Sequence, residues 1–352
     1  MRWMLRCLLL GFLASSIAGC DASPTDVRRA DQRVTLRPHL ENPRATVLPA
    51  FMYTPSVWPQ QGWLSDVNDA NLIVGMANGN AVAVQLGGAL VNLSNGPGSW
   101  SRAAAVNLRG AIVGGVDLGT LGQPNYVPAF WAHVGATPIL LPDLGEAADI
   151  NDHSVVVGGV TNRRGQGIAF YWDPNSGSLE RLPSLPGGRN ASAGSINNDH
   201  IVLGWSDATA PGWHPVLWQR NGSTWTVRQI MGGIEGYDID GGYGIVGHTN
   251  QSASYGTPDH LGYYNTTGPS YAMAVSGKGV VAGYDYGVPA PGGWYNSASA
   301  FVADQTGSTT YLPLPPGTWK ASFGYGLNRC GVVVGQLWTQ AGAQPSVWDP
   351  GC

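Results

Sequence analysis

A short polar turn followed by a β-branched run and a closing glycine occurs seven times between Leu64 and Gly335. Successive closing glycines are separated by 36 to 52 residues. Self-similarity at about this period indicates stacked or radially arranged units, and it constrains the fold more than any single motif does. The closing glycines are Gly75, Gly114, Gly158, Gly204, Gly247, Gly283 and Gly335.

The composition favours a folded, turn-rich, all-β protein. The chain contains 51 glycines and 25 prolines, and its hydrophobic fraction of 43% is too high for a disordered protein. The formal net charge is -4, and lysine occurs only at Lys278 and Lys320. Because nucleic-acid binding requires clustered cations, this charge distribution argues against a nucleic-acid partner.

Each repeat predicts four short strands joined by turns. In residues 147–188, strand-like runs alternate with turn residues, and no helical periodicity separates them. A four-stranded sheet of about 40 residues cannot bury both faces alone, so it must pack against its neighbours. We therefore predict a seven-bladed β-propeller of four-stranded antiparallel blades.

The two ends of the repeat region predict how the ring closes. The seventh repeat ends at residues 348–352, after its third strand, and residues 45–49 resemble the missing fourth strand. Supplying that strand from the N-terminal side would close the ring and cover an open edge. Fourth strands share a Leu-Pro step, which suits an outer edge, while residues 266–270 make a poor fourth strand for the fifth repeat.

The first residues predict export and lipid attachment. Residues 1–19 combine a basic start, a short apolar run and small residues, as a signal peptide does. Ile17-Ala18-Gly19-Cys20 resembles a bacterial lipobox, which implies lipid on Cys20. The alternative is an ordinary secretory peptide with a coincidental cysteine. Residues 20–44 would then form a flexible tether, and residues 45–352 would form the propeller. These features place the protein in a bacterial cell envelope, in either the inner or the outer membrane.

Two cysteines remain after lipidation and cleavage. In an oxidising compartment, Cys330 and Cys352 are expected to form a disulfide that pins the C-terminus to the last repeat. In the chain-entropy model, closing the loop between these cysteines would stabilise the fold by about 3 kcal/mol. Two free thiols are the alternative.

The repeats also resemble the HAF-repeat family of extracellular repeat proteins. Ile150-Asn151-Asp152 with its Val-Gly strand fits the family's IND…VVG core, and Asp143-Leu-Gly145 fits its exit. Ala129-Phe130, Ala169-Phe170 and Ala300-Phe301 fit the Ala-Phe element, although other residues replace the histidine there. The resemblance implies an exported repeat protein and brings no catalytic residues.

Aromatic residues concentrate in the segments predicted to follow the second strands, which share one face of a propeller. Variable aromatic loops on a rigid scaffold suit sugars or apolar protein anchors. We expect about half of these rings to pack between blades instead. The candidate binding residues are Trp205, Trp213, His214, Tyr255, His260, Tyr284, Tyr286, Trp294, Tyr295 and Trp338.

Catalysis and cofactor binding have weaker support. The Asn-Asp turns at Asn68-Asp69, Asn151-Asp152 and Asn198-Asp199 fit turn capping better than calcium binding. Asp238, Asp240 and His248 suggest a satisfied polar group near the channel rather than a catalytic centre.

We therefore predict a monomeric, lipid-anchored binding module for a glycan or an envelope protein, with no enzyme activity, cofactor or metal. A scaffold lipoprotein is the first alternative, and a glycan-active hydrolase or lyase the second.

Overall fold

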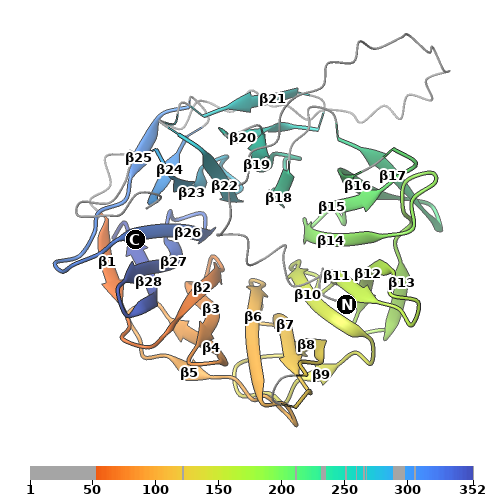
Figure 1. The fold of residues 1–352 in the computed structure, drawn as a ribbon, viewed down its shortest axis with the longest axis horizontal. Helices are drawn as coiled ribbons and strands as arrows, with labels where there is room; N and C mark the ends of the chain where they lie inside the picture. Colours follow the sequence, from red (N-terminus) through yellow and green to blue (C-terminus); the bar gives the residue numbers. More distant parts are fainter. Residues whose placement is uncertain are drawn as a thin grey trace. The chain divides into compact units, whose positions relative to one another are not determined.

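In a computed structural model, the chain forms a β-propeller of seven four-stranded antiparallel sheets (Figure 1). No helix occurs among the residues that the structure describes, and so none there has the length and apolar character to span a membrane. The seven-bladed fold predicted from the repeats is confirmed. The described residues are 53–120, 123–210, 212–230, 235–249, 252–258, 260–264, 266, 268–287, 298–304 and 307–351.

In blades 1 to 6 the strand order follows the chain, whereas in blade 7 the outermost strand is β1 (Thr54–Val57). The first strand of each sequence repeat lies nearest the central axis (Figure 1). Blades 1 to 3 comprise β2 (Gly62–Val67), β3 (Leu72–Ala77), β4 (Asn80–Gln85), β5 (Val91–Asn92); β6 (Trp100–Val106), β7 (Ile112–Asp117), β8 (Tyr126–Trp131), β9 (Ile139–Leu140); and β10 (Leu144–Ile150), β11 (Val156–Thr161), β12 (Gly167–Asp173), β13 (Ser178–Arg181). Blades 4 and 5 comprise β14 (Ala191–Ile196), β15 (Val202–Asp207), β16 (Trp213–Asn221), β17 (Thr224–Gln229); and β18 (Glu235–Ile239), β19 (Ile245–Thr249), β20 (Ser252–Thr257), β21 (His260–Tyr263). Blades 6 and 7 comprise β22 (Ser270–Val275), β23 (Val281–Asp285), β24 (Ser299–Ala303), β25 (Thr309–Tyr311); and β26 (Ala321–Leu327), β27 (Val333–Thr339), β28 (Gly342–Asp349), β1 (Thr54–Val57).

The ring is closed by a strand from the N-terminal side of the repeats. β1 pairs antiparallel with β28, with Thr54 opposite Asp349 and Val57 opposite Ser346. Figure 1 shows β1 at the outer edge of blade 7, next to β28. The closing strand thus lies after the predicted residues 45–49, which fall outside the described residues. The edge that blade 7 would expose is paired by this strand.

Two further strand predictions need correction. The fourth strand of blade 5 is β21 and not residues 266–270. The Leu-Pro steps follow the outer strands rather than lying within them: Leu182 and Leu312 come directly after β13 and β25 and are buried. There proline removes no ladder donor, because pairing has already ended.

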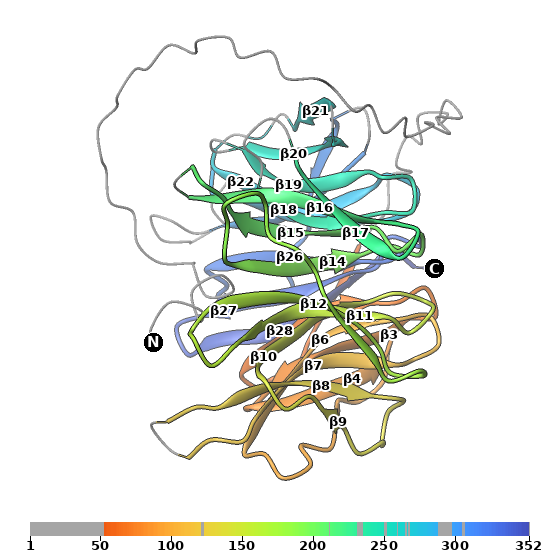
Figure 2. The same ribbon diagram turned by 90° about the vertical axis from the view of Figure 1, so that its right-hand side faces the viewer.

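Neighbouring blades pack face to face through apolar residues. Seen from the side in Figure 2, the sheets of blades 3 and 4 lie one above the other, and their core joins residues of both. Trp131, Trp218 and Trp348 are fully buried at the ends of third strands. Each indole Nε1 donates a hydrogen bond at 2.7–2.8 Å to a carbonyl of the preceding blade's exit, so these rings pack without an unpaired donor.

The closing glycines have a steric cause. The first strand of every blade contains a β-bulge opposite the second strand. A Cβ atom placed on any of the seven closing glycines would lie 1.9–2.2 Å from a carbonyl oxygen of that bulged strand. For Gly114 the oxygen belongs to Arg102. The repeat therefore requires glycine because two backbones approach more closely there than any side chain allows.

Candidate functional site

One face of the propeller is organised by the turns between first and second strands. The first residue of each turn is Asn68, Asn107, Asn151, Asn197, Asp240, Ser276 and Asn328. In Asn151, as in most of them, Oδ1 accepts backbone N–H groups two and four residues later. The fourth turn residue adopts a left-handed conformation in every blade, for example at Asn71 with φ 60°. Asparagine and aspartate suit these turns because their side chains cap them locally.

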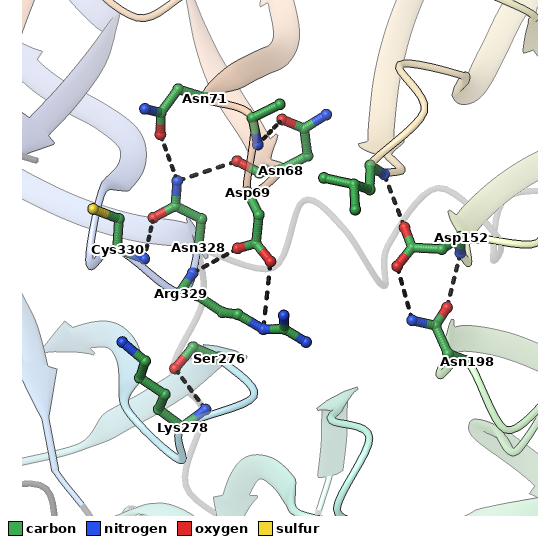
Figure 3. Close-up of polar contacts among 12 residues, drawn as sticks. Asn68, Asp69, Asn71, Asp152, Asn198, Ser276, Lys278, Asn328, Arg329 and Cys330 are labelled. Atoms are coloured by element: carbon green, nitrogen blue, oxygen red, sulfur yellow. Dashed lines mark hydrogen bonds and ion pairs between the residues drawn. The ribbon is translucent and has the colours of Figure 1, made fainter.

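The same asparagines connect neighbouring blades. The Nδ2 group of Asn68 donates to the carbonyl of Asn107 at 2.7 Å, and Asn107 donates to the carbonyl of Asn151 at 3.1 Å. Figure 3 shows the link that closes this series, from Asn328 to Asn68. We call the five inter-blade amide bonds the asparagine belt; they run from Asn328 through Asn68, Asn107, Asn151 and Asn197 to Asp240.

A second layer of side chains surrounds the belt. Asp69 accepts the backbone N–H of Arg329 and lies 3.4 Å from its Nε, while Asp152 and Asn198 exchange hydrogen bonds across blades 3 and 4 (Figure 3). The carboxylate groups of Asp69 and Asp152 thus accept hydrogen bonds from donors of the protein itself. No group of three or more His, Cys, Asp or Glu residues suited to a metal ion occurs within the described part of the chain.

The aromatic residues gather on the inner strands of blades 4 to 7. We call this set the aromatic seam: Trp205, Tyr237, His248, Tyr271, Tyr284, Tyr286, Phe323 and Tyr325. Its members come from first strands (β18, β22, β26) and second strands (β15, β19, β23), with Tyr286 directly after β23. All are partly buried. The seam crosses three consecutive blade interfaces.

The rings of the seam stack on one another. Tyr271 lies between His248, at a centroid distance of 4.3 Å and nearly parallel, and Tyr284, at 5.0 Å. Tyr284 meets Phe323 edge to face at 5.0 Å. Because both faces of Tyr271 are covered by neighbouring rings, this residue cannot offer a stacking face to a ligand. Burial raises the pKa of the Tyr284 and Tyr325 hydroxyls and lowers that of the His248 imidazole, so these rings stay uncharged near neutral pH.

The predicted binding residues divide into several groups. Trp205, Tyr284 and Tyr286 belong to the seam. Trp213 is 55% exposed at the start of the third strand β16, and Trp338 is 37% exposed near the end of the second strand β27. Both lie beside the turn between second and third strands, in blades 4 and 7 respectively. His214 lies next to Trp213, with Nδ1 3.2 Å from Nε2 of Gln229.

The other predicted residues lie elsewhere. Tyr255 was expected on a loop, but it lies on the third strand β20 and packs against the core between blades 5 and 6. His260 lies on the outer strand β21. Trp294, Tyr295, Cys20 and Cys352 fall outside the described residues, so the lipidation of Cys20 and the Cys330–Cys352 disulfide stay predictions.

Several seam residues were not selected from the sequence, namely Tyr237, His248, Tyr271, Phe323 and Tyr325. The second strands extend past their closing glycines, which places Trp205 and Tyr284 on strands rather than on loops. Their cross-strand and inter-blade neighbours are therefore first-strand residues. The available signal was an aromatic residue within the first strand of blades 5, 6 and 7, at Tyr237, Tyr271 and Phe323.

The corresponding positions of blades 2 and 3 are charged. Arg102 on β6 and Glu146 on β10 form an ion pair whose side chains are 15% and 28% exposed, and Nε of Arg102 donates to Oε1 of Glu146 at 2.8 Å. Burial lowers the pKa of Arg102 to about 10. Gly115 and Gly159 on the neighbouring second strands leave space, since a Cβ on Gly115 would lie 3.1 Å from Oε1 of Glu146.

Known structures resemble this fold at low sequence identity. The β-propeller domain of Cps50 (Swd1) from Myceliophteria thermophila aligns with a TM-score of 0.53 and 10% identity over 84% of this chain and 98% of that chain. The β-propeller domain of the Trilobed protease from Pyrococcus furiosus has a TM-score of 0.49, 11% identity and coverage of 72% and 82%; TolB from Acinetobacter baumannii has 0.44, 14%, and 68% and 64%.

No protein-family model matches the chain, and no curated protein matches it by sequence. The protein is a seven-bladed β-propeller, and the structural similarity extends to the fold alone.

Proposed function

We propose that this propeller is the non-catalytic binding module of an exported, lipid-anchored envelope protein, and that it recognises a glycan or an envelope protein. The observation that carries the proposal is the pair of exposed indoles, Trp213 and Trp338, on the same face of blades 4 and 7. Tryptophan is enriched among the residues that dominate binding energy at interfaces, so exposed indoles suit recognition. The seam between these two blades supplies a rigid base, so little conformational entropy would be lost on binding.

The test compares indole variants with a matched apolar variant. A Cys20→Ala protein, which cannot carry the predicted lipid, is screened on a glycan array and against envelope extracts, and hits are quantified by titration. Trp213→Ala or Trp338→Ala should weaken binding about tenfold or more, as a hot-spot residue does. Leu179→Ala, at an equally exposed position on outer strand β13, should bind as the wild type does.

Two results would count against this function. If both tryptophan variants bind like the wild type, the indoles are not the recognition site. If they lose binding only together with a lower melting temperature, their role is structural.

The predicted lipid attachment and membrane location are tested separately. Cys20→Ala should move the protein from the membrane fraction to the soluble fraction, and mass spectrometry of the mature N-terminus should find lipid on Cys20. An unlipidated N-terminus formed by cleavage at another position would support the ordinary secretory peptide.

A scaffold role is the second candidate. The face-to-face stacking of His248, Tyr271 and Tyr284 favours it, because these rings bind each other rather than present open faces. A scaffold predicts that no array or extract component binds in a manner that depends on Trp213 or Trp338.

A further inference from the structure

Three aspartates connect blades along the inner strands. Asp66, Asp149 and Asp238 occupy the same position after the bulge of β2, β10 and β18. In each, one oxygen accepts the backbone N–H of the following residue of its own strand. The other oxygen accepts a backbone N–H from the next blade, at Val106, Ile196 and Val275 respectively, over 2.7–2.9 Å. Each carboxyl group therefore joins two blades.

Ser195 connects two of these aspartates. It occupies the same position in β14, between the two acidic blades, and is buried. Its Oγ lies 2.9 Å from Oδ2 of Asp149 and 2.8 Å from Oδ1 of Asp238. A hydroxyl group has one proton and can donate to one of them only. The other contact is attractive only if that carboxyl group carries a proton and donates it to Oγ.

We propose that Asp149, Ser195 and Asp238 share one carboxyl proton at mildly acidic pH and form a titratable latch that holds blades 3, 4 and 5 together. When the proton is lost, two carboxylates face a single hydroxyl proton, and one contact of the latch becomes repulsive. The latch is independent of the proposed recognition function, because none of its three residues belongs to the aromatic seam or the exposed indoles.

Other titratable groups lie around the latch. Burial, together with the charges of Asp149 and Asp238, raises the pKa of Asp66 on β2. Burial, together with the charge of Asp238, raises the pKa of Asp240 after β18. On the same strands Glu146 is paired with Arg102, and Glu235 accepts a hydrogen bond from Tyr237. His248 on β19 lies against Tyr271, and burial lowers its pKa.

The pKa directions agree with this geometry. Burial, followed by repulsion from Asp238, raises the pKa of Asp149 to about 6, and burial raises the pKa of Asp238. Burial also raises the pKa of Asp66 to about 7.

A carboxyl group whose folded pKa is raised binds more protons in the folded state than in the unfolded state. Stability therefore increases as pH falls through the folded pKa, and it stops increasing near the unfolded value of about 3.9. The latch should therefore be strongest near pH 4, weaken as pH rises through about 6, and be weakest above pH 7.

The experiment measures the pH dependence of unfolding together with direct detection of the proton. The melting temperature of the full chain is measured from pH 5 to pH 8.5, and infrared difference spectra monitor the protonated carboxylic-acid stretch. The wild type should melt several degrees higher at pH 5.5 than at pH 8.5. Asp149→Asn and Asp238→Asn should each reduce this difference by about half and remove carboxylic-acid intensity at pH 5.5.

Matched variants separate the latch from general charge effects. Asp143→Asn removes an exposed carboxyl group and should leave the pH difference as in the wild type. Ser195→Ala should lower the melting temperature more at pH 8.5 than at pH 5.5. If no carboxylic-acid signal at pH 5.5 responds to Asp149→Asn or Asp238→Asn, or if both variants keep the wild-type pH difference, the proposal is wrong. Should either asparagine variant fail to fold, the remaining one and the infrared spectrum of the wild type still decide the question.

Discussion

The side-chain amide of Asn328 donates a hydrogen bond to the backbone carbonyl of Asn68 at 3.1 Å, although the two residues lie 260 positions apart in the chain. The same amide donates to Oδ1 of Asn71 at 2.7 Å, while Oδ1 of Asn328 accepts the N–H groups of Cys330 and Val332. One side chain thus caps its own turn and joins the last blade to the first. Blade 7 and blade 1 are connected here as well as by the closing strand β1.

Asn328→Asp should weaken this closure. The carboxylate keeps the two capping acceptors but removes the Nδ2 donor and places negative charge against the carbonyl of Asn68. Because Asn328 is buried, the free energy of unfolding should fall by about 1–3 kcal/mol. Urea unfolding followed by tryptophan fluorescence measures the change. Asn175→Asp, the same replacement at an exposed turn, is the control and should change stability by less than about 0.5 kcal/mol.

Ser276→Asn should have the opposite effect. The asparagine belt is interrupted between Asp240 and Asn328, since Asp240 has no amide to donate and the serine side chain is short. An asparagine at position 276 would cap its turn through Oδ1 and place an amide near the carbonyl of Asn328. We expect a gain of about 1 kcal/mol, the usual net value of one hydrogen bond. An unchanged or lower unfolding midpoint would show that the turn of blade 6 cannot adopt the geometry of the other blades.

The repeat spacing was sufficient to predict the architecture because every unit repeats the same two local features. A polar turn caps itself, and a β-branched second strand passes a bulge at a glycine. The exact closing strand was harder to predict. Residues 45–49 resemble an outer strand as closely as Thr54–Val57 do, because an edge strand is short and only one of its sides is paired. Local composition therefore specifies it weakly.

Gly114→Ala tests why the repeat ends in glycine. The new Cβ would meet the carbonyl oxygen of Arg102 at 2.0 Å and Cα of Ala103 at 3.0 Å, and both atoms belong to the backbone. Neither can move without separating β6 from β7, so the loss should exceed about 4 kcal/mol or prevent folding. Gly241→Ala serves as the control, because a Cβ there meets nothing within 4 Å. Thermal melts that place Gly114→Ala within about 1 °C of the control would contradict the steric explanation.

The candidate site was only partly predictable, for a geometric reason. All four of the predicted residues Trp213, Trp338, Tyr255 and Tyr284 lie on strands, but Trp213 and Trp338 are exposed whereas Tyr255 and Tyr284 are partly buried. A loop assignment depends on where a strand ends, and the second strands run two to four residues beyond the glycine that marks them. The contact of Tyr271 with His248 depends on the packing of two neighbouring blades, and no local pattern encodes that contact.

Arg102 and Glu146 should behave as a coupled pair. Removing one partner leaves the other charge largely enclosed between blades 2 and 3, so Arg102→Met should cost about 2–3 kcal/mol. This is below the usual loss for a completely buried pair, because 28% of the Glu146 side chain remains exposed. Glu146→Gln should cost a similar amount by leaving the guanidinium group without its carboxylate.

The double variant Arg102→Met/Glu146→Gln should recover much of this loss, since no unpaired charge remains and the methionine fills the same space. Denaturant unfolding of the wild type, the two single variants and the double variant gives the coupling free energy directly. Additive losses would mean that each side chain stabilises the blade interface by its own packing. A coupling of at least 1 kcal/mol would show that the ion pair itself joins blades 2 and 3, where blades 5 to 7 use stacked rings.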